Sequence, residues 1–205
     1  MFVDESGLAL KVCRYCRALI PVAVLKWRRT LQSETGAARA ASARLRRASS
    51  VLDALMLEET LALIKAVRHA EPRAPSGDFE QRLVVLAMTL AHIETDAKTP
   101  LARALGQSAV GRSPAGDERP RLSPARFGAL VRSARTRDWA GVARALRRAL
   151  AILGNAPIDV ASLIRDVLFL NDATLRRWTY DYWQTRAPGD DEPSQSASNE
   201  MEPAS

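Results

Sequence analysis

The sequence predicts an all-α protein, and two features of its composition support this prediction. Ala, Leu and Arg, all good helix formers, dominate a chain of 205 residues that is 47% hydrophobic and only 5% aromatic. The chain contains few glycines and lacks the alternating Val, Ile and Thr runs that strands require. Its length is sufficient to bury a substantial core in one or two domains.

The first helices can be placed from proline and serine positions. Residues 1–20 leave two interpretations open, an extra helix or a poorly ordered extension. Pro21 suits the first turn of a helix that ends at about Leu31. An alanine-rich helix is predicted over about 37–48. A third helix is predicted over about 51–67, capped by the two serines that precede it.

The most apolar helix is predicted near the middle of the chain. A loop with two prolines and a glycine occupies 71–78. The following segment, 79–93, is apolar around much of its circumference and should therefore lie at the centre of a bundle. A short helix over about 100–105 comes next. The Gly/Ser/Pro-rich stretch 106–121 then marks the clearest domain boundary in the chain.

Each helix of the second half has a recognisable start. A serine followed by proline suits an N-cap and first helical position, and aspartates suit the later N-caps. From Ala187 onward the composition is typical of a disordered tail. The expected helix starts are Ser123-Pro124, Asp138, Pro157 or Asp159, and Asp172.

The predicted organisation is two small helical bundles joined by a loop, followed by a disordered acidic C-terminal tail. We expect an N-terminal extension over 1–21, an N-terminal bundle over 22–106, a linker over 107–121, a C-terminal bundle over 122–186 and the tail over 187–205.

The charge of the chain is distributed unevenly. The formal net charge is +7, and the sequence pI is about 10.1. The tail from Gly189 holds five acidic residues and no basic one, so the remaining residues carry +12. Such a body attracts phosphate in a salt-dependent way. The alternative from charge alone is a basic but merely solvated surface.

No membrane or metal site is expected. The longest apolar run, from Ala18 to Leu25, is far below the ~18 residues of a membrane span and is interrupted by a proline. No small-residue cleavage site follows it, so we expect a cytoplasmic protein.

Cys13 and Cys16 form a lone C-x-x-C without the second ligand pair that zinc requires. We interpret them as ordinary cysteines on one helical turn and expect no cofactor.

No convincing active site is present in the sequence. His69 ends a predicted helix beside a loop and is expected to be solvated. His92 lies between apolar positions and is expected to be a satisfied core or interface histidine. The carboxylates of Glu58 and Glu59 point about 100° apart on a helix, which is poor geometry for shared acid–base work. We therefore expect no enzymatic activity and no small-molecule substrate.

The distribution of arginines is the main evidence in the sequence for a function. Seven basic residues and one acidic residue lie between Lys26 and Arg47, and nine against one lie between Arg119 and Arg148. Arg144, Arg147 and Arg148 are spaced at i, i+3 and i+4, which places their Cβ atoms ~5–6 Å apart, comparable to the repeat of a nucleic-acid backbone. Guanidinium groups bind phosphate oxygens in a bidentate fork.

This pattern predicts contact with the nucleic-acid backbone and not with bases. No predicted helix bears Asn or Gln at base-reading positions, and no aromatic platform is evident. The four tryptophans occupy amphipathic positions and are expected in the core or at interfaces.

Several short motifs together cover roughly 22–186. They are Trp27-x3-Leu31, Arg39, Leu45-Arg46-Arg47 with Ser49, Leu122-Ser123-Pro124-Ala125-Arg126-Phe127-x2-Leu130, Leu146-Arg147-Arg148-Ala149-Leu150, Leu163-Ile164-x2-Val167-Leu168 and Arg177-Trp178-x-Tyr180-x-Tyr182. These motifs and their order resemble the CasB family, the small subunit of the type I-E CRISPR surveillance complex Cascade.

The resemblance implies a non-catalytic subunit that pairs with a second copy of itself beside the other Cascade subunits. It would help to hold target DNA and the displaced strand while the crRNA supplies sequence recognition in antiviral defence. The positions that match the family as nucleic-acid contacts are Arg46, Arg47, Arg126, Arg147 and Arg148. Arg44, Arg132 and Arg144 are added on charge and spacing alone.

Two other functions remain open at this point. A helical protein-interaction adaptor would use its charge only for solubility and would show no appreciable salt-dependent DNA binding. An arginine-rich helix-turn-helix regulator would prefer particular duplex sequences, but the sequence offers no recognition helix for it.

Overall fold

The structure is a computed structural model that describes residues 2–3, 9–10, 14–72, 77–108 and 119–185, with side chains from Ala18 onward. The fold is all-α, as predicted. Beside the helices, the described part holds one short antiparallel ladder between β1 (Phe2–Val3) and β2 (Ala9–Leu10). The predicted tail at 187–205, Cys13 and most of the predicted linker lie outside the described residues.

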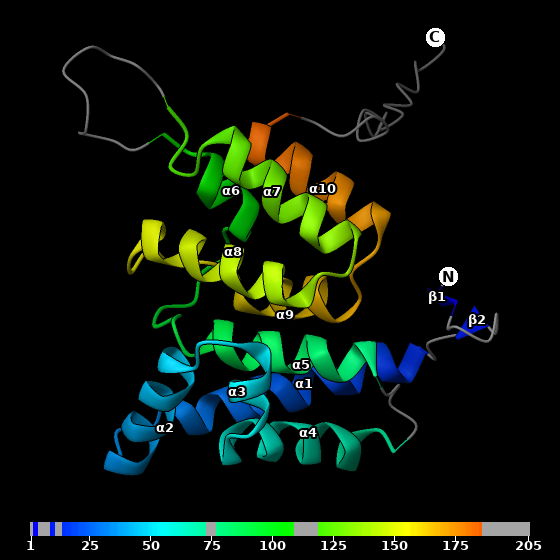
Figure 1. Ribbon diagram of the computed structural model, residues 1–205, viewed down its shortest axis with the longest axis vertical. Coiled ribbons are helices and arrows are strands. Elements are labelled where there is room, and N and C mark those ends of the chain that lie inside the picture. The colour runs from blue at the N-terminus through cyan, green and yellow to red at the C-terminus, as the bar shows by residue number, and fades with distance from the viewer. Residues whose placement is uncertain (1, 4–8, 11–13, 73–76, 109–118, 186–205) are drawn as a thin grey trace, which may run out of the picture.

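Figure 1 shows the helices in their order along the chain. Among those of the described chain, none is long and apolar enough to cross a membrane. In chain order they are α1 (Arg14–Leu31), α2 (Gly36–Arg47), α3 (Val51–Leu55), α4 (Glu58–Ala70), α5 (Asp78–Leu90), α6 (Leu101–Gly106), α7 (Pro124–Arg135), α8 (Trp139–Leu153), α9 (Val160–Leu168) and α10 (Asp172–Trp183).

The first helix begins earlier than predicted. Pro21 lies inside α1 and does not open it, so the predicted helix start is wrong. An internal proline removes one backbone hydrogen bond. The cost is offset here because Ile20 and Val24, on either side of Pro21, are completely buried in the core. Residues 14–20, whose conformation the sequence left open, therefore extend this helix.

The predicted helix over 51–67 is in fact two helices. Leu57 has an extended backbone (φ −78°, ψ 137°) and separates α3 from α4. The start of α3 is a capping box, in which the Ser50 hydroxyl accepts from the Asp53 amide and the Asp53 carboxylate accepts from the Ser50 amide. The break allows α3 to pack on α5 and α8 while α4 packs on α1 and α5.

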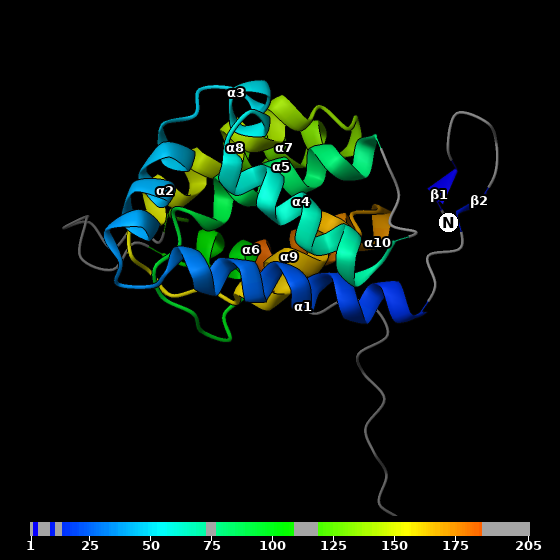
Figure 2. The same cartoon turned by 90° about the horizontal axis from the view of Figure 1, so that it is seen from below.

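Helix α5 lies at the centre of the molecule, which confirms the prediction from its apolar circumference. Every residue from Arg82 to Ala91 is buried. Figure 1 shows α1 and α4 on one side of α5 and α8 and α9 on the other. The 90° view in Figure 2 shows α2 at one end of this arrangement, close to α8.

The helix starts of the second half are mostly as predicted. Asp138 accepts from the Gly141 amide at 2.9 Å, and Asp159 accepts from the Ser162 amide at 2.7 Å. Asn171, one residue before the predicted Asp172, caps α10. Ser123 is the N-cap of α7 and Pro124 opens the helix, as predicted, although the Ser123 side chain makes no capping hydrogen bond.

Residues on both sides of the predicted linker share one hydrophobic cluster. Helix α6 packs against α10, and α5 packs against α8 and α9. The Tyr182 hydroxyl donates to the Leu122 carbonyl at 2.6 Å, and the ring of Tyr182 stacks on Phe127 with centroids 4.0 Å apart. The helices before and after 109–118 are thus joined by extensive packing, and the division into two bundles stays a prediction.

Candidate nucleic-acid interface

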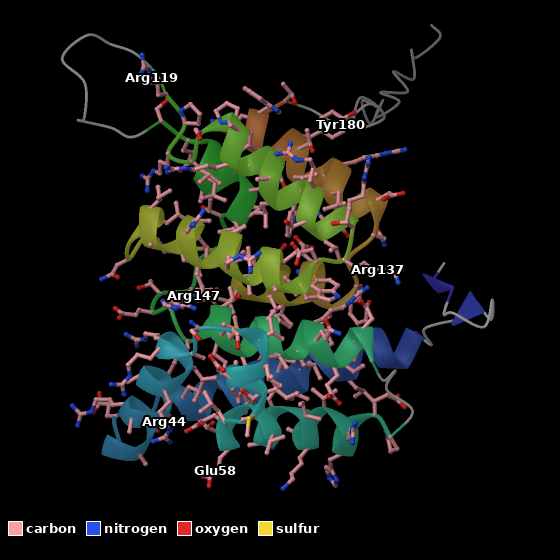
Figure 3. All side chains as sticks on the ribbon, in the orientation of Figure 1. Arg44, Glu58, Arg119, Arg137, Arg147 and Tyr180 are labelled. Carbon is pink, nitrogen blue, oxygen red and sulfur yellow. The ribbon has the colours of Figure 1, made fainter. Side chains whose placement is uncertain are left out.

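The end of α2 and the middle of α8 meet at the surface and bring two arginine groups together. Nη1 of Arg147 donates to the Ala48 carbonyl at 2.7 Å, and Nη2 donates to the Arg46 carbonyl at 2.8 Å. Figure 3 shows Arg147 on the side of α8 that faces the lower layer of helices. We call the surface formed by Arg46, Arg47, Arg144, Arg147 and Arg148 the basic junction.

Arg147 has a structural role at this junction. The last carbonyls of a helix lack partners within the helix and carry the negative end of its dipole. The Arg147 guanidinium, which is half-buried, donates to two carbonyls at the end of α2 and so caps one helix from another. Its positive charge stays at the surface, but its removal would also loosen the contact between α2 and α8.

Arg46 and Arg47 are exposed and anchored by only one nitrogen each. Nε of Arg46 donates to the Ala91 carbonyl at 2.8 Å, and Nε of Arg47 donates to the Ala43 carbonyl of its own helix at 3.2 Å. Their terminal nitrogens have no hydrogen-bond partner among the residues that the structure describes. Each therefore retains a positively charged fork that an external phosphate can accept from.

Arg144 and Arg148 lie one turn apart on α8 and are fully available to solvent. Both are exposed, and neither side chain forms a hydrogen bond or ion pair with any residue of the described ranges. The opposite face of α8 is buried through Val142, Leu146 and Ala149. These two arginines are the members of the junction whose charge serves no internal contact.

Arg44 is the predicted contact whose charge is already matched. Its guanidinium forms an ion pair with Glu59, and Nε donates to the same carboxylate oxygen at 2.9 Å. The hydrogen bond and the charge of Glu59 raise the pKa of Arg44. Glu59, which the sequence placed in an unsuitable acid–base pair with Glu58, thus has a structural partner.

Arg126 and Arg132 lie on another helix, α7, and the structure does not join them to the junction. Helix α8 lies between α7 and α5 in Figure 1. Both side chains are exposed and, within the described part of the chain, form no hydrogen bond or ion pair. The predicted contact residues therefore divide between a surface at the α2–α8 junction and a second one on α7.

His92 lies next to the junction, a placement that the sequence did not reveal. Burial lowers the pKa of His92 below its ordinary value, and the charges of Arg147 and Arg46 lower it further, so the ring is neutral near pH 7. Its Nε2 atom is buried and has no hydrogen-bond partner among the described residues. The expectation of a satisfied histidine is therefore wrong for this nitrogen.

Two arginines are internal, and one of them, Arg28, was counted in the first basic stretch of the sequence. Arg28 is 6% exposed and donates to the Ile93 carbonyl at 3.1 Å. Arg82 is 3% exposed, forms an ion pair with Asp78 and donates to the Leu168 carbonyl at 2.8 Å. A count of basic residues along the sequence cannot separate these buried groups from surface ones.

The described residues offer little for catalysis. No group of three or more His, Cys, Asp or Glu side chains in the described ranges could hold a metal ion. His69 is exposed at the end of α4. Trp27, Trp139 and Trp178 are buried and unavailable for stacking on bases, whereas Trp183 is 55% exposed.

The fold and this surface define a small all-α protein with a basic helical junction. Residues 41–183, from the middle of α2 to the end of α10, match the family model described as CRISPR-associated protein Cse2. The chain belongs to this family, the CasB/Cse2 small subunits of type I-E Cascade, which confirms the resemblance found in the sequence. No curated protein and no solved structure matches the chain.

Membership of this family places the chain in the type I-E Cascade complex. Its members are structural subunits that associate with the other subunits of Cascade. All residues of the basic junction lie inside the matched range.

Proposed function

We propose that the chain binds nucleic-acid backbone non-specifically within Cascade and stabilises the R-loop formed between crRNA and target DNA during antiviral defence. It catalyses no reaction itself. The observation that carries this proposal is the basic junction, where arginines about a hundred residues apart in the sequence form one surface.

The chemistry of the junction suits phosphate and not bases. Arg144 and Arg148 present unpaired charges one helical turn apart, and Arg46 presents the fork of a guanidinium whose stem is fixed. Contacts of this kind position a strand but carry no sequence information. In a complex in which the guide RNA pairs with the target, a subunit of this kind has no need to read bases.

The proposed partners are the crRNA, the target DNA, the other Cascade subunits and a second copy of this chain. Arg126 and Arg132 lie on α7, which packs on α8, while α8 in turn packs on α5. They provide an additional basic face. We propose that these two faces serve different contacts, because α8 lies between α7 and the helices below it.

The double substitution Arg144→Ala and Arg148→Ala tests the proposal. It removes two exposed charges and leaves the Arg147 cap of α2 intact. Binding of labelled single-stranded DNA of unrelated sequences would be measured over a salt series. We expect weaker binding at low salt and a salt slope lower by about 1.4, since each contact to single-stranded nucleic acid contributes about 0.7.

The matched control is Arg165→Ala with Arg176→Ala, which removes the same charge from exposed positions on α9 and α10. The control should retain the wild-type slope more closely. If wild-type protein shows no salt-dependent binding, or if both double variants bind alike, the basic junction is ordinary surface and a protein-interaction adaptor becomes the better description.

A further inference from the structure

A pocket of about 170 Å³ lies where the α7–α8 turn approaches the start of α10. Its polar lining consists of Arg82, Arg135, Arg137, Asn171 and Asp172, and the remainder is apolar. One water molecule needs roughly 10–15 Å³ of such space, so the pocket has room for a larger polar group. Figure 3 shows Arg137 at the start of α8, well separated from Arg147 further along the helix.

Arg82 forms a fixed positive wall of this pocket. It is 3% exposed, and Asp78, the Leu168 carbonyl and the ring of Trp139 hold it in place, with its Cζ 5.0 Å from the ring centroid. Burial lowers the pKa of Arg82, Asp78 opposes this effect, and the charge of Arg137 lowers the pKa further. Two guanidinium groups thus lie close enough to repel each other, and an anion between them would relieve this repulsion.

Arg137 adopts a backbone conformation that disfavours its own side chain. Its φ is +56°, in the left-handed region that glycine adopts at little cost. The turn is fixed by the Arg137 amide, which donates to the Ala134 carbonyl at 3.3 Å, and by the Trp139 amide, which donates to the Arg137 carbonyl at 2.9 Å. Because glycine would fit this position at lower cost, the presence of an arginine indicates a role for its side chain.

The opposite wall adds a donor and one acidic group. The Asn171 side-chain oxygen accepts from the Thr174 amide at 2.9 Å, so its amide nitrogen is left as a donor without a partner in the described structure. Asp172 opposes anion binding. Because Asp78 balances Arg82, the charges of Arg135 and Arg137 outweigh that of Asp172 and leave the pocket positive.

We infer that this pocket, with Arg135 and Arg137 beside the buried Arg82, binds a phosphate group at a site separate from the basic junction. The phosphate belongs either to a nucleic-acid strand or to a free phosphate compound. Assignment to a strand rests on the proposed function, whereas anion binding by the pocket does not.

The substitution Arg137→Gly tests this inference without disturbing the fold. Glycine adopts the left-handed conformation at little cost, so the substitution removes strain from the turn. The variant should therefore unfold at the same or a higher denaturant concentration than wild type. Arg135→Ala removes the second guanidinium without involving the turn, and Arg165→Ala controls for loss of one surface charge. Calorimetry would measure the binding of inorganic pyrophosphate and of tetrathymidylate to the full chain.

Both probes should bind wild type and the Arg165→Ala control, and both should weaken at least about tenfold in Arg137→Gly and in Arg135→Ala. Binding of pyrophosphate without tetrathymidylate would support the pocket and overturn its assignment to a strand. Equal binding of pyrophosphate by wild type and both pocket variants, or no binding at all, would overturn the inference. The Arg144/Arg148 variant should bind pyrophosphate normally, which keeps this test independent of the basic junction.

Discussion

Replacing Arg82 with Met should lower the free energy of unfolding by about 3 kcal/mol, the largest effect that we expect from one substitution. Methionine preserves much of the apolar stem but removes the charge that pairs with Asp78 and the donor to the Leu168 carbonyl. The Leu168 carbonyl would then lose the Arg82 donor, and the Asp78 carboxylate would lose its ion pair and keep the indole N–H of the buried Trp139. Urea unfolding followed by far-UV circular dichroism measures the change.

The matched control is Arg68→Met, which also breaks an arginine–carboxylate pair. The Arg68 side chain is 63% exposed and pairs with Glu80 at 3.2 Å. An exposed pair contributes little, so we expect a change within about 0.5 kcal/mol. Similar losses in the two variants would contradict the internal role assigned to Arg82.

The substitution Gly106→Ala should destabilise the protein by about 2–3 kcal/mol. Gly106 ends α6, and its backbone lies directly against α10. A Cβ atom there would lie 2.7 Å from the carbonyl carbon of Tyr182 and would overlap the carbonyl oxygen. The clash is with backbone, which cannot rotate away, so the two helices would have to separate. Urea unfolding measures this loss as well.

Gly36→Ala provides a control, because its expected effect on stability has the opposite sign. Gly36 begins α2, and nothing lies within 4 Å of an added Cβ atom. Alanine should therefore stabilise the helix by up to about 0.5 kcal/mol through its higher helix propensity. If Gly106→Ala behaves like Gly36→Ala, the close packing of α6 on α10 is not present in solution.

Local patterns were sufficient to predict the helical fold and much of its order. The apolar circumference of 79–93 correctly indicated the central helix α5, and aspartates correctly marked the starts of α8 and α9. The errors at Pro21 and Leu57 have a common cause. In both places tertiary packing overrides local preference, since Ile20 and Val24 hold a proline inside a helix and a break at Leu57 lets α3 and α4 cover different neighbours.

The arrangement of the candidate site could be predicted only in part. The spacing of Arg144, Arg147 and Arg148 correctly indicated a basic helix face, but no local signal indicates that Arg147 caps α2. That contact joins residues about a hundred positions apart, which one sequence cannot pair. The buried Arg28 and the pocket at Arg137 were missed because charge counts contain no information on burial.

The arginines of this protein divide into structural and available groups, and this division decides which substitutions are informative. Arg82 and Arg147 hold backbone carbonyls, so their removal changes stability as well as charge. Arg144 and Arg148 hold nothing within the described structure, so their removal changes the surface alone. A loss of nucleic-acid binding can be assigned to charge only for the second group.

The lifetime of the R-loop on a Cascade complex assembled with this chain tests the central claim most directly. Complexes with wild-type chain and with the Arg144→Ala and Arg148→Ala variant would be matched for subunit occupancy and compared at low and high salt. We predict that the variant assembles normally but releases the R-loop faster at low salt, and that the difference shrinks as salt rises. Equal lifetimes at low salt, with equal occupancy, would contradict a role of the basic junction in holding nucleic acid.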